Sequence, residues 1–143
     1  MDFDWELLHF IHKNASIGVG TIPCTLALPQ SRAMGPALQN QLKEYRAIAA
    51  QSQAYAKSHQ HHLRSPGSFS LIRSVFTLKL KVLLDPSTSK LAEQIIHASI
   101  TDVVQITRRL HQQTNRTDPI LLELGRRLLA AEERYLQEMK RFL

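Results

Sequence analysis

The apolar residues of this chain recur mostly at steps of three and four positions, the spacing that places side chains on one face of an α-helix. The clearest stripe lies within residues 87–113, directly after Asp85-Pro86, a pair that ends one element before the next begins. We expect this helix to supply the central apolar face against which the others pack. The stripe consists of Leu91, Ala92, Ile95, Ile96, Ser99, Val103, Ile106 and Leu110.

Two earlier segments predict long helices over residues 2–28 and over a stretch that ends near residue 61. Pro23 lies inside the first, so we expect a kink or break near residues 19–23. The second begins either at Ser31 or at Gly35-Pro36, with Pro36 in the first helical position. The first stripe is Trp5, Leu8, His12, Ala15, Val19, Ile22 and Leu26, and the second is Leu38, Leu42, Tyr45, Ala49, Ser52 and Ala56.

The C-terminal segment, residues 119–142, predicts the most regular helix, capped by Thr117 or Asp118. Residues 69–84 are ambiguous, because residues 77–82 alternate like a strand while the longer segment also forms a helical stripe. A lone strand would have no partner in an otherwise helical chain. We therefore expect a shorter helix there, either in the core or as a covering crossover.

Short connections between long helices favour antiparallel neighbours. The pattern as a whole therefore predicts an all-α protein: an up-down antiparallel four-helix bundle with an additional shorter helix, formed by residues 1–143 as a single domain. The composition, 43% hydrophobic and 21% charged, is typical of a globular protein.

Composition narrows the function classes. The single cysteine, Cys24, excludes an internal disulfide framework and a multi-cysteine zinc site. The chain begins Met1-Asp2-Phe3 without a basic and apolar leader, and it contains no run of 18 apolar residues. We therefore expect no membrane span and a cytoplasmic location.

The formal net charge of +6 permits binding to nucleic acid or another anionic partner. The basic residues are scattered, however, and long helices do not suit a helix-turn-helix reader of DNA. An ordinary solvated surface is thus favoured over a nucleic-acid site. The residues that would form an anionic-partner surface are Arg73, Lys79, Lys81, Arg108 and Arg109.

Helical bundles can hold a carboxylate-bridged metal pair, which needs Glu-x-x-His on two helices and a glutamate on two others. Only Glu6-x-x-His9 has that form here. In an up-down layout, however, other acids and a histidine fall at similar depth along the axis, at about 1.5 Å per residue. One hypothesis is that these side chains form a divalent metal site. The alternative is that they are solvated or hydrogen-bonded to one another. Its members are Glu44, Glu93, His97 and Glu132.

The remaining reactive side chains favour structural roles. His12 falls on an apolar stripe, where a lone histidine is usually a hydrogen-bonded core residue. The histidine-rich end at residues 59–62 suits either a metal-binding tract or imidazolium groups at a helix C-terminus. Cys24 is interpreted as a small packing residue. No catalytic constellation is predicted.

Several short motifs resemble a group of small helical-bundle proteins of Gram-positive bacteria, usually likened to the ferritin fold. The resemblance implies an all-α bundle without an assigned activity, and this chain departs from iron-binding members in lacking paired Glu-x-x-His motifs. The motifs are Leu7-Leu8-x-x-Ile11-x-x-Asn14-Ala15-x-x-Gly18, Gln41-Leu42-Lys43-Glu44-Tyr45, Ser87-x-Ser89-x-Leu91-Ala92-Glu93, Glu132-Glu133 and Phe142-Leu143.

These observations favour a non-enzymatic bundle that acts through self-association or another protein–protein interaction, with a homo-oligomer expected. The first alternative is the metal-binding, ferritin-like bundle described above. The second is binding of an anionic partner through the basic residues. No cofactor is expected apart from the divalent metal of the first alternative.

Overall fold

The computed structural model describes residues 3–64, 67, 75, 84–112 and 115–143, and these residues form helices and connecting turns without a strand. The prediction of an all-α protein is confirmed. The α-helices are α1 (Phe3–Leu26), α2 (Gly35–Ser58), α4 (Thr88–His111) and α5 (Pro119–Met139), and the 3-10 helices are η1 (Pro29–Met34) and η2 (Lys140–Phe142).

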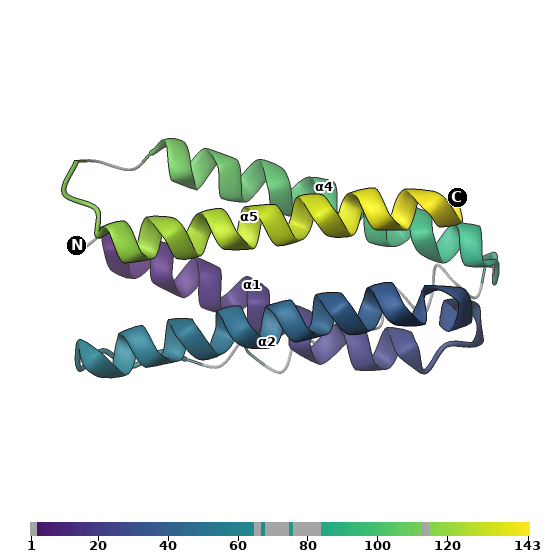
Figure 1. The fold of residues 1–143 in the computed structure, drawn as a ribbon, viewed down its shortest axis with the longest axis horizontal. Helices are drawn as coiled ribbons and strands as arrows, with labels where there is room; N and C mark the ends of the chain where they lie inside the picture. The colour runs from purple at the N-terminus through teal and green to yellow at the C-terminus, as the bar shows by residue number, and fades with distance from the viewer. Residues whose placement is uncertain (1–2, 65–66, 68–74, 76–83, 113–114) are drawn as a thin grey trace.

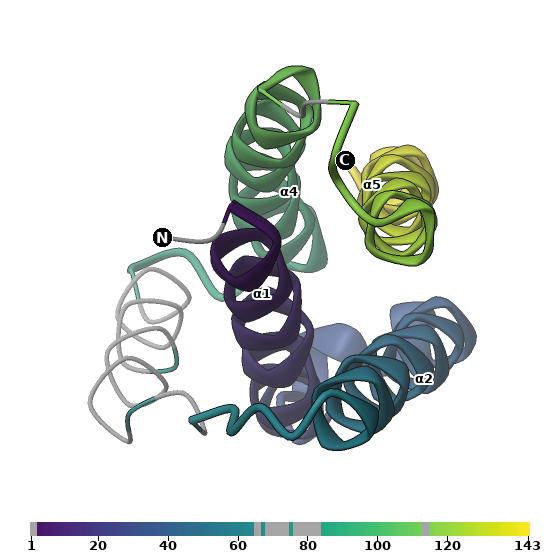
Figure 2. The ribbon, with the colours of Figure 1, turned by 90° about the vertical axis from the view of Figure 1, so that its left-hand side faces the viewer.

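The four α-helices pack against one another as two antiparallel pairs (Figure 1). Helix α1 packs along α2, helix α4 packs along α5, and α5 also contacts both α1 and α2. An end-on view shows the four helices around a common interior, with α1 between α2 and α4 (Figure 2). The interior is therefore lined by side chains from each of the four α-helices that the structure describes.

Hydrogen bonds at the two ends of the molecule show in which direction each α-helix runs. The Thr88 hydroxyl donates to the carbonyl of Gln30 at 3.0 Å, which holds the start of α4 beside η1 and hence beside the start of α2. At the other end, the Tyr55 hydroxyl donates to Asp118 at 2.7 Å and joins the end of α2 to the start of α5. Helices α2 and α4 therefore run in the same direction, opposite to α1 and α5.

The predicted helix starts are mostly confirmed. Ser87 caps α4 by accepting a hydrogen bond from the amide of Lys90 at 3.0 Å, and Asp118 caps α5 by accepting from the amide of Ile120 at 2.9 Å. Of the two predicted starts for α2, the one at Gly35-Pro36 is correct. The start at Ser31 is wrong because residues 29–34 form η1 instead.

Helix α1 continues through Pro23 to Leu26, so the predicted break is wrong and the kink stays a prediction. Pro23 lies in the last turn of α1 and is exposed, so its ring stays away from the core. The helix loses one backbone hydrogen-bond donor at this position. The predicted short helix or crossover at residues 69–84 lies almost wholly outside the described residues.

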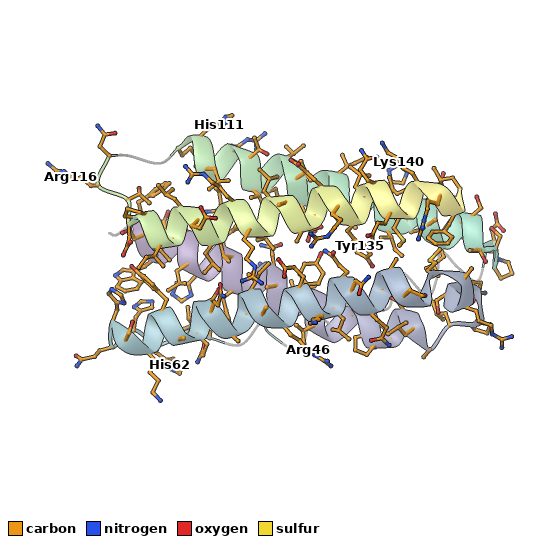
Figure 3. All side chains as sticks on the ribbon, in the orientation of Figure 1. Arg46, His62, His111, Arg116, Tyr135 and Lys140 are labelled. Atoms are coloured by element: carbon orange, nitrogen blue, oxygen red, sulfur yellow. The ribbon has the colours of Figure 1, made fainter. Side chains whose placement is uncertain are left out.

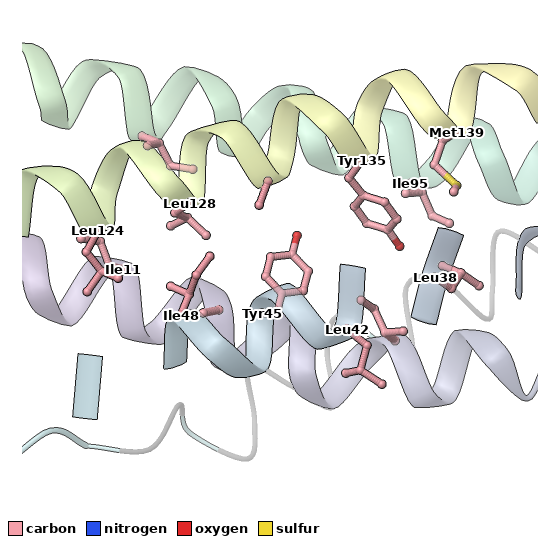
Figure 4. Close-up of a cluster of buried hydrophobic side chains, with 14 of the residues drawn as sticks. Ile11, Leu38, Leu42, Tyr45, Ile48, Ile95, Leu124, Leu128, Tyr135 and Met139 are labelled. Atoms are coloured by element: carbon pink, nitrogen blue, oxygen red, sulfur yellow. The ribbon is translucent and has the colours of Figure 1, made fainter. Parts of the chain in front are cut away.

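The core is built from the predicted stripes, with one shift in phase. In α1 the buried face is centred on Ile11, Ala15 and Gly18, whereas His12 and Val19 are only half-buried. The aliphatic side chains that line α2, α4 and α5 meet in the interior (Figure 4). The largest fully buried apolar residues are Leu8, Ile11, Met34, Leu38, Ile48, Leu91, Ile106, Leu121, Leu128 and Met139.

None of the described helices has the length and apolar character needed to cross a membrane.

Candidate functional site

Glu44, the first residue of the predicted metal site, is engaged with a cation. Its two carboxylate oxygens accept hydrogen bonds from Nε and Nη2 of Arg127, at 2.9 and 2.8 Å, in a bidentate pair that joins α2 to α5. These hydrogen bonds lower the pKa of Glu44. Glu44 is therefore an ionised partner of Arg127 at the seam between two helices.

The other three predicted metal ligands occupy different surroundings. Glu93 forms an ion pair with Lys90 at 2.6 Å on the surface of α4, and His97 is exposed one turn farther along. Glu132 is buried in the interior. Within the described ranges, no group of three or more histidine, cysteine, aspartate and glutamate side chains is placed to hold a metal ion. The four-residue site stays a prediction.

Glu132 is the one member of that set in an unusual environment. It projects from α5 into the core with 2% of its surface exposed. The Tyr45 hydroxyl, from α2, donates to its Oε1. Its Oε2 is buried and has no partner at hydrogen-bond distance. A buried carboxyl oxygen without a partner is costly and calls for an explanation.

Helix α4 contributes a second acid to the same region. Burial raises the pKa of Asp102 to about 6. Burial, followed by the charge of Asp102, raises the pKa of Glu132 to about 8, against the opposing effects of the Tyr45 and Ser99 hydroxyls. The two carboxyl groups therefore interact electrostatically, and Glu132 is mostly protonated at neutral pH.

A cavity of about 290 Å³ adjoins this carboxyl pair. Helices α1 and α4 provide most of its wall, and the buried residues of α2 and α5 lie at its deep side. Its polar lining comprises amide, hydroxyl and carboxyl groups without a lysine, arginine or histidine among the described side chains. The polar residues are Asn14, Thr21, Thr25, Tyr45, Gln94, Ser99, Asp102, Glu132 and Tyr135.

Two of the residues that line the cavity are tyrosines. Figure 4 shows both of their side chains in the interior of the bundle. Tyr45 and Tyr135 meet edge to face, with ring centroids 6.4 Å apart. Burial raises the pKa of both phenols, so both stay neutral hydrogen-bonding groups. Gly18 makes room for the Tyr45 ring, because a Cβ added there would lie 2.3 Å from Cδ2 of that ring.

Chemically, this arrangement suits the capture of a positive charge. None of the described basic side chains lines the cavity beside the carboxyl pair, and both acids release protons more readily when a cation lies beside them. Hydroxyl and amide groups on the wall can orient a ligand through hydrogen bonds.

Sequence reasoning found Glu132 but missed Asp102 and the role of Tyr45. The signal for Asp102 was present in the sequence. Ile95, Ser99, Asp102 and Ile106 follow one another at steps of four, three and four, which places an acid on the apolar stripe of α4. An ionisable residue in such a position is a candidate for a perturbed pKa.

The other single candidates have local partners. His12 lies 3.4 Å from the hydroxyl of Ser16, and burial lowers its pKa. The Cys24 thiol donates to the carbonyl of Gly20 at 3.6 Å within α1, which agrees with a packing role.

The predicted basic surface is only partly within the described residues. Arg108 is exposed, whereas the guanidinium of Arg109 lies over the ring of Phe10, 4.3 Å from its centroid. Other basic residues that are labelled in Figure 3 point outward from helices and from connecting segments, while Tyr135 points inward. Residues 73, 79 and 81 fall outside the described part of the chain, so the anionic-partner hypothesis stays a prediction.

No family model, curated protein or solved structure matches this chain.

Proposed function

We propose that this protein is a non-enzymatic, ferritin-like helical bundle whose function is to bind a small organic cation in its interior cavity. One observation carries the proposal: Oε2 of Glu132 is buried in the cavity wall and has no partner at hydrogen-bond distance, although the Ser99 hydroxyl is near enough to lower the pKa of Glu132. A ligand ammonium group at that position would supply the missing donor and a compensating charge.

The charge of the lining supports a cation over an anion. The protein carries a net charge of +6, yet Asp102 and Glu132 are the carboxyl groups of a cavity wall that contributes no described basic side chain. An anionic ligand would meet two acids, whereas an ammonium group would relieve their mutual repulsion. The isoleucines of the wall suit an apolar body attached to that group.

A lone metal ion fits less well. The cavity volume of about 290 Å³ exceeds what one ion needs, and only two of its described lining residues carry carboxyl groups. An amine with an aromatic or aliphatic body fills the space and uses the apolar wall as well.

Benzylamine is expected to bind and to raise the melting temperature, whereas benzyl alcohol, which has the same shape without the charge, is not. Because the cation favours ionised Glu132, binding should release a proton. Affinity should therefore rise up to about tenfold per pH unit from pH 6 towards pH 8, near the raised pKa of Glu132. Calorimetric titration in two buffers of different ionisation enthalpy measures both the affinity and the proton release.

Glu132→Gln and Glu133→Gln form a matched pair for this test, because Glu133 is the exposed neighbour on α5. The first change should abolish the preference for benzylamine over benzyl alcohol, and the second should leave it intact. Equal binding of both compounds by the wild-type protein would contradict the proposal.

Self-association is a second candidate function, favoured by an exposed apolar pair on α4. Ile100 and Val104 lie one turn apart with 46% and 49% of their surfaces exposed. Val104 also borders a shallow depression that reaches His111. A second copy of the chain would bury both aliphatic side chains, a gain of about 25 cal/mol per Å² of apolar surface.

Under this second proposal, Val104→Lys is expected to shift a homodimer to monomer, because a charge in a buried interface is costly. Size-exclusion chromatography with light scattering measures the change. Ile120→Lys, which places the same charge at an apolar residue of α5 that is 62% exposed, should leave the dimer intact. A wild-type protein that is monomeric at every concentration tested would rule this function out.

A further inference from the structure

Two histidines meet at the end of the molecule where α1 begins and α2 ends. His9 lies on α1, and His61 follows α2 by three residues. Their Nε2 atoms are 2.9 Å apart, and their rings cross at an interplanar angle of 74°. At this distance the two imidazoles form a hydrogen bond, and the same two nitrogens come from separate elements and lie close enough together to bind one metal ion.

We propose that His9 and His61 form a binding site for copper(II) or nickel(II), with water completing the coordination. This site is separate from the interior cavity, since neither histidine lines it.

The distance between the two Nε2 atoms can be compared with the distance that each coordination geometry requires. Imidazole nitrogens bind at about 2.0–2.1 Å from a divalent first-row metal. Two such ligands at a right angle, as in tetragonal or octahedral coordination, are then about 2.9 Å apart, close to the observed distance. Tetrahedral coordination would require about 3.3 Å, so zinc fits the pair less well. Metal binding would replace the hydrogen bond between the two imidazoles, and each ring would turn until both lone pairs meet at the metal.

Neighbouring side chains hold the two imidazole rings close together, and the neutral form of His9 is favoured. The Trp5 indole stacks on the His61 ring, with centroids 4.0 Å apart and an interplanar angle of 5°. Burial, followed by the charges of His61 and Arg64, lowers the pKa of His9 and keeps its imidazole neutral near pH 7. A histidine must be neutral to ligate a metal. The Arg64 charge also disfavours a bound cation, so we expect moderate affinity.

Neighbouring histidines are less suited to join the pair. Nδ1 of His59 is 2.9 Å from the carbonyl of Tyr55, and its ring stacks on the Tyr55 ring. His12 is one turn farther along α1 and contacts Ser16. On the N-terminal side of His9, exposed Glu6 lies one turn away and brings a negative charge to the same helix face.

Trp5 makes the site observable, because it is the only tryptophan in the chain and stacks on a proposed ligand. Titration of the untagged full chain with copper(II) chloride should quench Trp5 fluorescence saturably at one equivalent. The electron paramagnetic resonance spectrum of the complex should show hyperfine coupling to two imidazole nitrogens. His9→Ala and His61→Ala should each weaken binding at least tenfold and leave coupling to a single nitrogen.

His62→Ala is the matched control, because His62 is the exposed neighbour of His61 and should bind copper like the wild type. His9→Gln gives a variant that keeps a hydrogen bond to His61 but loses the metal ligand, and circular dichroism verifies that it is folded. The proposal is overturned if copper does not quench Trp5, or if folded His9→Gln binds copper as tightly as the wild type.

Discussion

The wild-type protein is expected to lose about 2 kcal/mol of its free energy of unfolding between pH 6.5 and pH 8, and Glu132→Gln is expected to abolish most of that loss. The folded-state pKa of Glu132 is about 8, against an ordinary value of 4.5. In this window the unfolded chain has already released the proton that the folded protein still holds. Stability therefore falls as pH rises, by about 1.4 kcal/mol per unit for one group.

Other groups with shifted pKa values act mainly below this pH window. The pKa of Asp102 is raised to about 6, so its contribution to stability falls as the pH rises towards 6 and changes little above that. The lowered pKa values of His9 and His12 make stability rise with pH until the unfolded imidazoles, with an ordinary pKa of 6.5, have lost their protons, about one pH unit above that value. Glu44 gains stability from its ion pair above its ordinary pKa of 4.5 and loses it in acid. Glu132→Gln retains all of these contributions, so the difference between its slope and the wild-type slope isolates Glu132.

Urea unfolding followed by circular dichroism at pH 6.5, 7.2 and 8.0 measures this effect. Glutamine keeps the shape of the side chain and can still bond to Tyr45, so the slope against pH is the test rather than the absolute stability. Glu133→Gln, on the exposed side of α5, should retain the wild-type slope. A Glu132→Gln protein with the same slope as the wild type would contradict the raised pKa.

Gly18→Ala is expected to destabilise the protein by about 2–3 kcal/mol, although alanine is the better helix former by about 1 kcal/mol. The new Cβ would lie 2.3 Å from Cδ2 and 2.4 Å from Cε2 of the Tyr45 ring. That ring is buried against Tyr135 and bonded to Glu132, so it cannot move without breaking the bond. The displaced hydroxyl and carboxyl would then both be buried without partners.

Gly35→Ala is the matched control, because a Cβ there meets nothing within 4 Å and the backbone is already helical. It should be neutral or slightly stabilising. Thermal and urea unfolding report the difference, and near-ultraviolet circular dichroism reports displacement of the tyrosine. If Gly18→Ala were as stable as the wild type, the close packing of α1 on Tyr45 would be refuted.

Helix positions followed from local sequence. The capping side chains of Ser87 and Asp118 and the proline after Gly35 mark helix starts by hydrogen bonding to, or removing, the first backbone donors. These effects act within one turn, so they can be deduced without the rest of the molecule. The apolar stripes likewise placed most core residues, except where α1 turns its Gly18 face inward in place of His12.

The grouping of acids could not be predicted in the same way. Depth along the helix axis placed Glu44, His97 and Glu132 at similar levels, but the rotation of each helix decides which side chain faces inward. Packing turned Glu44 towards Arg127, left His97 exposed and buried Glu132. A few tens of degrees of rotation separate a core position from a surface one, and this rotation depends on all neighbouring helices at once.

The sequence alone determined that this chain forms long amphipathic helices, where most of them begin, and which residues are apolar enough to form a core. Those properties depend on side-chain periodicity and capping within a few residues. The tertiary structure alone decided that Asp102 joins Glu132 beside a cavity and that His9 meets His61 across 52 positions of sequence. Such pairings depend on helix rotation and direction, which are set by packing between segments far apart in the chain.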